Sequence, residues 1–294
     1  MLALFLAVLA LAGCAPGNKD IKRLRASCES GNAQACHDFA EKLRKGEYVL
    51  KDDTRAAGLF ERACGTGVAE GCAKFGFMLQ RGIGTKRDSA RALEMFRQGC
   101  DRGALDGCAR LGVLYQDGKG VARDLARAAA LYTRACDGGE MTGCARLGGL
   151  YASGEGVARN FSLAAAHLTT SCDAKVPLGC VGLGRLHIAG TGVTRNDSIA
   201  AAMFEASCTK EENAGCFDLA IVAEAGQGIP QNFERAAELY REACEDRHGE
   251  ACARLAALHE KGAGVYRSPR AAKEYHRQAC DAGLSESCLK SKGS

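Results

Sequence analysis

The stretch Cys100-Asp-Arg-Gly-Ala-Leu-Asp-Gly-Cys108 decides the fold of this chain. Within one continuous helix, eight steps of about 1.5 Å would hold the two cysteines about 12 Å apart, whereas a disulfide joins Cα atoms at most about 7 Å apart. The chain must therefore turn between them if they are to pair. Gly103 can supply the left-handed conformation that ends a helix, so the stretch predicts a helix–turn–helix corner stapled by its own cysteines.

The same corner recurs every 36 residues, eight times. A constant period indicates that each unit packs on its neighbours in the same geometry, because an insertion would shift the next interface out of register. The expected disulfide cysteines are Cys28 and Cys36, Cys64 and Cys72, Cys100 and Cys108, Cys136 and Cys144, Cys172 and Cys180, Cys208 and Cys216, Cys244 and Cys252, and Cys280 and Cys288.

The composition fits an exported helical protein. The 294 residues are 47% hydrophobic, enough to bury a large core, and the net charge of +4 is too small to predict binding to nucleic acid. Seventeen cysteines are too many for a reduced cytosolic protein of this length unless they bind metal. Zinc ligands usually pair two to four residues apart, and the pairs here have no matching histidines, so we expect disulfides and no metal or cofactor.

Residues 1–13 form an apolar run that is too short to span a bilayer and has the length of a secretory signal. Leu11-Ala12-Gly13-Cys14 resembles the bacterial lipobox, which implies that Cys14, the odd cysteine, is lipidated, and Ala15 resembles outer-membrane sorting. An ordinary cleaved signal is the alternative. We expect a signal peptide over 1–13, a lipidated polar tether over 14–20, one repeat domain over 21–294, and membrane contact through the lipid alone.

Two helices per repeat are predicted from the spacing of apolar residues. In the unit that begins at Cys108, one run comprises Leu111, Leu114 and Tyr115, and the other comprises Ala128, Leu131, Tyr132 and Ala135. Gly112 allows a close helix approach, and a loop with two glycines leads to Asp124, which is placed to cap the second helix. In the first unit, Glu47 and Tyr48 stand where later loops have the glycine pair. The cap position elsewhere holds Asp52, Asp88, Asn160, Asn196, Asn232 and Ser268.

Three motifs carry a family resemblance: Leu147-Gly-Gly-Leu-Tyr151, Gly154-Glu-Gly-Val157 and Ala164-Ala165. They resemble Sel-1-like repeats, relatives of the tetratricopeptide repeat, and the cysteine spacing is similar to the secreted, cysteine-rich Hcp-type branch. The resemblance covers the chain from about residue 21 to its end. It implies an all-α, right-handed superhelical solenoid of about seven 36-residue helix pairs, stapled by disulfides, whose concave face is lined by the first helix of each unit.

The resemblance also implies a binding face. In the related repeats, ligand contacts lie at fixed offsets around the second cysteine of each pair, and in this sequence those positions vary while the others stay constant. We therefore expect a protein or peptide partner in the concave groove; ordinary solvated or intra-solenoid positions are the alternative. Phe77, Phe217 and Ile221 are expected as exposed apolar anchors. The expected contact residues are Phe77, Gln80, Arg81, Val113, Gln116, Arg185, Ile188, Phe217, Ile221 and Glu224.

An enzymatic alternative comes from the resemblance alone, because some Hcp-type proteins are described as penicillin-binding with weak β-lactamase activity. Ser287-Cys-Leu-Lys290 matches the Ser-x-x-Lys motif, in which a lysine lies one helical turn from a nucleophilic serine. The sequence has no Ser-Asp-Asn or Lys-Thr-Gly partner motif, and Cys288 is already assigned to a disulfide. We therefore assign no catalytic residue.

A row of basic residues precedes the caps, one in nearly every loop. It would lie along one edge of the repeats, where contact with an acidic polymer of the cell envelope is one interpretation and a solvated edge is the more common one. Gln231 interrupts the row, which comprises Lys51, Arg87, Arg123, Arg159, Arg195 and Arg267.

Overall fold

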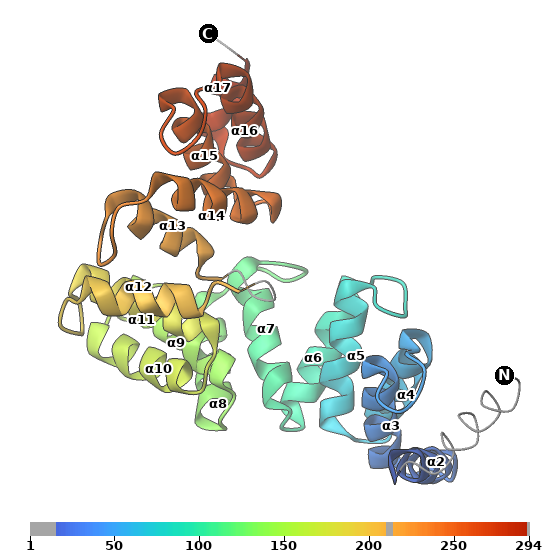
Figure 1. Ribbon diagram of the computed structural model, residues 1–294. Helices are drawn as coiled ribbons and strands as arrows, with labels where there is room; N and C mark the ends of the chain where they lie inside the picture. Colours follow the sequence, from blue (N-terminus) through green and yellow to red (C-terminus); the bar gives the residue numbers. More distant parts are fainter. Residues whose placement is uncertain (1–15, 210–213, 293–294) are drawn as a thin grey trace, which may run out of the picture. The chain divides into compact units, whose positions relative to one another are not determined.

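The computed structural model (Figure 1) describes residues 16–209 and 214–292, and every regular element in these ranges is an α-helix. Two compact units, Met1–Gly143 and Cys144–Ser294, span the range that we expected to form one repeat domain. The helices up to the boundary are α2 (Pro16–Glu29), α3 (Ala33–Lys45), α4 (Asp53–Gly65), α5 (Ala69–Arg81), α6 (Ser89–Asp101), α7 (Leu105–Asp117) and α8 (Leu125–Asp137). They are followed by α9 (Met141–Ser153), α10 (Phe161–Asp173), α11 (Pro177–Ala189), α12 (Asp197–Ala206), α13 (Cys216–Ala225), α14 (Phe233–Glu245), α15 (Gly249–Lys261), α16 (Pro269–Asp281) and α17 (Ser285–Lys292).

The helices alternate in role along the chain. From α3 onward, odd-numbered helices are the first helix of a repeat and even-numbered helices are the second, which confirms the predicted all-α repeat architecture. Helix α2 begins at Pro16, so part of the expected tether 14–20 is helical. Residues 1–15, including Cys14 and the expected signal peptide, lie outside the described residues. None of the described helices is both long and apolar enough to cross a membrane.

Each described staple joins the second helix of one repeat, or for Cys208 the segment directly after α12, to the start of the next repeat, as predicted. Cys100 in α6 bonds to Cys108 in α7 with Cα atoms 4.5 Å apart, and Gly103 between them has the expected positive φ of 101°. Cys136 and Cys144 are also disulfide-bonded. The remaining bonds, with Cα separations of 4.5–4.8 Å, are Cys28–Cys36, Cys64–Cys72, Cys172–Cys180, Cys208–Cys216, Cys244–Cys252 and Cys280–Cys288.

The predicted caps of the second helices are confirmed. In each case the side-chain oxygen accepts a hydrogen bond from the backbone N–H three residues later, for example from Arg127 N to Asp124 Oδ1 at 2.9 Å. Such a cap contributes about 1 kcal/mol of helix stability. The other caps are Asp52, Asp88, Asn160, Asn196, Asn232 and Ser268, which precedes Pro269 at the first helical position.

A large side chain on the second helix packs over a glycine on the first helix of the same repeat. Tyr132 on α8 is fully buried, and a Cβ atom added to Gly112 would lie only 2.6 Å from its ring. The glycine therefore allows the two helices to approach closely, as expected. The same pairing recurs as Gly76 with Phe96, Gly148 with Leu168, and Gly184 with Phe204.

In four loops the second glycine, Gly84, Gly192, Gly228 or Gly264, marks a contact between repeats. Gly84 has φ +64°, and a Cβ there would overlap the backbone oxygen of Asp53 at the start of α4 in the preceding repeat. The first repeat differs from our expectation, because Gly46 (φ +71°) takes the place of the first glycine. Tyr48 adopts the left-handed φ of +62° and keeps its side chain 69% exposed.

Two glycine substitutions separate backbone strain from loss of packing. Gly84 and Gly120 both have positive φ, but a Cβ at Gly120 meets nothing within 4 Å. We expect Gly120→Ala to destabilise the fold by about 1–2 kcal/mol through the left-handed conformation alone. Gly84→Ala should cost about 1–3 kcal/mol more, because the repeats must separate to admit the methyl group. Urea unfolding under oxidising conditions measures both, and equal losses would contradict the inter-repeat role of Gly84.

Candidate functional site

Within each compact unit the expected contact residues lie along one side of the first helices, which we call the first-helix face. Phe77 and Gln80 on α5 are three positions apart and lie on one side of that helix, and Val113 and Gln116 occupy the same positions on α7. In Cys144–Ser294 the same positions hold Arg185 and Ile188 on α11 and Ile221 and Glu224 on α13. Arg81 and Arg185 are exposed, while the other seven are half-buried.

Phe217 corrects the expectation of an exposed anchor. It is only 9% exposed, and its ring lies 4.2 Å from that of His248 and 5.9 Å from that of Tyr240. Its position, directly after the second cysteine, faces the neighbouring helices. The repeats themselves signalled this, since the same position elsewhere holds a buried alanine: Ala73, Ala109 and Ala145.

Contacts between neighbouring repeats make the first-helix face continuous within each unit. Lys74 Nζ lies 3.8 Å from Glu41 Oε1, and the Arg110 guanidinium lies 4.5 Å from the centre of the Phe77 ring. Arg254 likewise donates to Glu224, at 3.4 Å. Lys74, Arg110 and Arg254 share one position, two residues after the second cysteine, which our sequence analysis did not include. The recurrence of a basic residue there was visible in the sequence.

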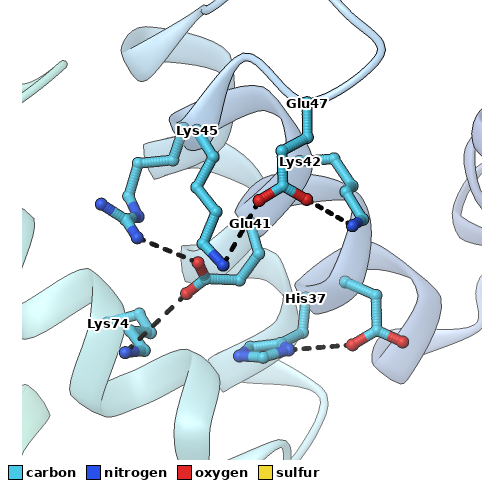
Figure 2. A network of polar contacts seen from close by, with 8 residues as sticks. His37, Glu41, Lys42, Lys45, Glu47 and Lys74 are labelled. Carbon is cyan, nitrogen blue, oxygen red and sulfur yellow. Dashed lines mark hydrogen bonds and ion pairs between the residues drawn. The ribbon is translucent and has the colours of Figure 1, made fainter.

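Figure 2 shows how polar this face is in the first repeat. Glu41 on α3 lies between Arg44, at 3.1 Å, and Lys74 on α5. Glu47 accepts a hydrogen bond from Lys42 at 2.5 Å and lies 3.6 Å from Lys45. The Lys42 hydrogen bond holds the pKa of Glu47 below its usual value, and the same bond raises the pKa of Lys42. The first repeat therefore presents a network of paired charges.

In one contact between repeats the acidic and the basic residue exchange positions. Asp218 is 8% exposed and occupies the position of the basic residues above, while Arg185 in the preceding repeat donates to both its carboxylate oxygens at 2.7 and 2.8 Å. The hydrogen bond to Asp218 raises the pKa of Arg185. A buried carboxylate is tolerated only when it is paired in this way, so Asp218 depends on Arg185.

Two expected contact residues also support the core. Tyr132 and Tyr240, both fully buried, donate their hydroxyls to Gln116 Oε1 and Glu224 Oε2, each at 2.7 Å. Burial, reinforced by the bond to Glu224, raises the pKa of Tyr240 above its usual range. Gln116 and Glu224 thus have structural partners that the sequence pattern did not reveal.

Intrachain contacts account for members of the basic row before the caps. Arg123 and Arg267 each donate through Nε to the carbonyl seven residues earlier, at 3.1 Å, in the last turn of a first helix. Gln231 makes the same bond at 2.9 Å, which explains why it can replace an arginine. Arg195 pairs with Asp197 through both carboxylate oxygens, and Lys51 lies 3.3 Å from Asp53. These contacts require no external polymer.

The Ser-x-x-Lys motif and one cluster of potential metal ligands are two further candidate reactive sites. Ser287 is 3% exposed on α17 and Lys290 is exposed, so this motif offers no accessible serine. Within the described ranges, one cluster, formed by Cys208, Cys216 and Glu242, brings potential metal-binding atoms together. Its two sulfurs form a disulfide and therefore provide no thiolate ligands.

The architecture recurs in two proteins of known structure, one from Escherichia coli and one from Oxalobacter formigenes. The chain is similar to a protective antigen of uropathogenic Escherichia coli with the SLR fold, at 27% identity and TM-score 0.60. The match covers 93% of this chain and 60% of that protein, so the chain spans less than two thirds of this relative. A Sel1 repeat protein from Oxalobacter formigenes is 21% identical with TM-score 0.61, covering 96% of this chain and 82% of its own. Cysteine-rich protein B of Helicobacter pylori is 27% identical with TM-score 0.36, covering 46% and 97% respectively.

No match was found among curated proteins. The Sel1 repeat pattern itself matches seven consecutive segments: residues 33–65, 69–103, 105–140, 142–176, 177–211, 213–248 and 249–284. These segments cover most of the sequence, in register with the helix pairs and staples described above. The chain therefore belongs to the Sel1 repeat family.

Proposed function

We propose that this protein is an exported scaffold that binds a protein or peptide partner through a groove lined by its first-helix face. One observation carries the proposal. Phe77 and Val113 in one unit occupy the same repeat position as Arg185 and Ile221 in the other, yet these residues differ in size and charge, while the core and cap positions hold nearly constant types. A fixed frame with a variable strip suits recognition of an extended partner by local pockets.

Export is supported by the disulfides. Cytosolic thiols are kept reduced, whereas staples such as Cys28–Cys36 and Cys244–Cys252 form and persist in oxidising compartments. We further propose that Cys14 carries the lipid anchor, because it follows the apolar run and has no counterpart at the 36-residue period.

Metabolic labelling tests the anchor. Labelled palmitate should enter the wild-type protein and should be absent from Cys14→Ser, because the thiol of Cys14 is the expected attachment point of the diacylglyceryl group that carries the acyl chains. A wild-type protein that incorporates no label would contradict the anchor and leave the repeat scaffold untouched.

Site-specific photo-crosslinking tests the binding face. The crosslinking residue p-benzoylphenylalanine replaces Arg81 on the first-helix face of α5, and in a matched control it replaces Arg97 on the second helix α6; both positions are exposed. Irradiation of cells that naturally make the protein should yield a discrete protein adduct from position 81, which mass spectrometry then identifies. Position 97 should yield none. Equal adducts from both positions, or none from position 81, would contradict the proposed face.

A further inference from the structure

Five residues near the corner between α14 and α15 depart from the pattern of the repeats. They are Arg185, Phe217, Asp218, Arg247 and His248. No other repeat has a basic residue at the position of Arg185. Four other helix pairs have a basic residue at the position of Asp218, and four have alanine at the position of Phe217. The position of Arg247 holds a glycine in five other corners: Gly31, Gly67, Gly103, Gly139 and Gly283. The position of His248 holds an apolar residue, which makes no side-chain cap, at Val68, Ala104 and Val176.

All five residues line one cavity of about 290 Å³ in the Cys144–Ser294 unit. Phe217 provides an apolar wall, and Asp246 lies at the rim together with Arg247. In a repeat protein, departures that serve only local packing need not converge on a single cavity. Their convergence here indicates a binding pocket rather than a set of independent substitutions.

Asp218 orients Arg185 in this pocket. The two hydrogen bonds use Nε and Nη2 of the guanidinium, so Asp218 occupies one edge of the fork. The other edge, formed by Nη1 and the second hydrogen of Nη2, makes no hydrogen bond to the residues that the structure describes, and the Arg185 side chain is 61% exposed. A guanidinium held in this way is suited to bind a second carboxylate in bidentate geometry.

His248 supplies another fixed donor. Its Nδ1 accepts a hydrogen bond from the backbone N–H of Ala251 at 3.2 Å, which caps α15. The neutral ring therefore carries its proton on Nε2, and that N–H can donate to a ligand. Its ring lies 4.2 Å from that of Phe217, so the donor sits beside an apolar surface.

Arg247 is held in a strained conformation. Its φ of +64° lies in the left-handed region, where glycine is favoured and is found in five other repeats. Arg247 lines the same cavity, and its side chain can supply a third donor beside Arg185 and His248. Lys175 adopts the same conformation at the equivalent position, so what distinguishes Arg247 is its place in the lining of this cavity.

We propose that this pocket binds a carboxylate group of the partner, with Arg185, Arg247 and His248 as donors, Asp218 as the positioning residue, and Phe217 beside the adjacent apolar part of the ligand. The proposal rests on the proposed function and names the chemistry recognised at one point of the first-helix face. The carboxylate belongs either to the C-terminus of a peptide or to an acidic side chain.

Nuclear magnetic resonance of the full, oxidised chain tests the proposal with small probes. N-acetyl-leucine should shift the Arg185 Nε–H and His248 ring signals saturably, whereas N-acetyl-leucinamide, which lacks the carboxylate, should not. N-acetyl-glutamic acid α-amide offers only a side-chain carboxylate. Tighter binding of N-acetyl-leucine assigns the pocket to a chain terminus, and tighter binding of the glutamate derivative assigns it to an acidic side chain.

Two variants separate binding from folding. Arg247→Gly should raise the melting temperature by about 2 °C by relieving the left-handed strain, yet weaken N-acetyl-leucine binding about 3- to 10-fold. His248→Asn should keep the α15 cap, as Asn32 does for α3, and weaken binding several-fold. Arg270→Gln, at an exposed position on α16, is the matched control and should bind as wild type.

Equal shifts with the acid and the amide, or wild-type affinity in Arg247→Gly, would overturn the carboxylate pocket. The crosslinking experiment at position 81 lies in the other compact unit and does not involve these residues. A position 81 adduct without carboxylate binding would therefore refute this inference alone, and carboxylate binding without that adduct would refute the wider binding face alone.

Discussion

The corner between two cysteines eight positions apart is the constraint on which the rest of the structure depends. Cys100 and Cys108 bond with Cα atoms 4.5 Å apart because the chain turns between α6 and α7, with Gly103 in the left-handed conformation. Closing a loop of about nine residues stabilises the fold by about 2.6 kcal/mol on the loop-entropy model. Each repeat contacts only its neighbours, so these local staples supplement the modest core that a single helix pair can build.

A fixed corner sets the register for everything else. The large side chain over its glycine and the cap before the second helix recur at constant offsets, as in Tyr132 over Gly112 and Asp124 before α8. Because the frame is constant, side chains on the first-helix face can differ in charge between repeats while the same positions remain in contact. Lys74 with Glu41 and Asp218 with Arg185 join the same two positions of adjacent repeats, with the charges reversed.

The sequence was most informative where structure is local. Helices, caps and corners follow from spacing along the chain, so the architecture and the described staples could be predicted without coordinates. The burial of Phe217, the bond from Tyr240 to Glu224 and the pairing of Arg185 with Asp218 depend on how side chains of different helices meet. Periodicity along one helix cannot show these contacts. Comparing equivalent positions among the repeats, as for the alanines at the Phe217 position, recovers part of this information.

Urea unfolding of the oxidised and reduced protein, followed by far-ultraviolet circular dichroism, tests most directly whether the staples hold the frame. The loop-entropy contributions of eight disulfides would together exceed the net stability of about 5–15 kcal/mol typical of folded proteins. The oxidised chain should therefore unfold in a cooperative transition at high urea, and the chain reduced with a phosphine should lose most of its helical signal at little or no urea. The same midpoint in both states would show that the helix pairs are stable without their staples, which would contradict this account.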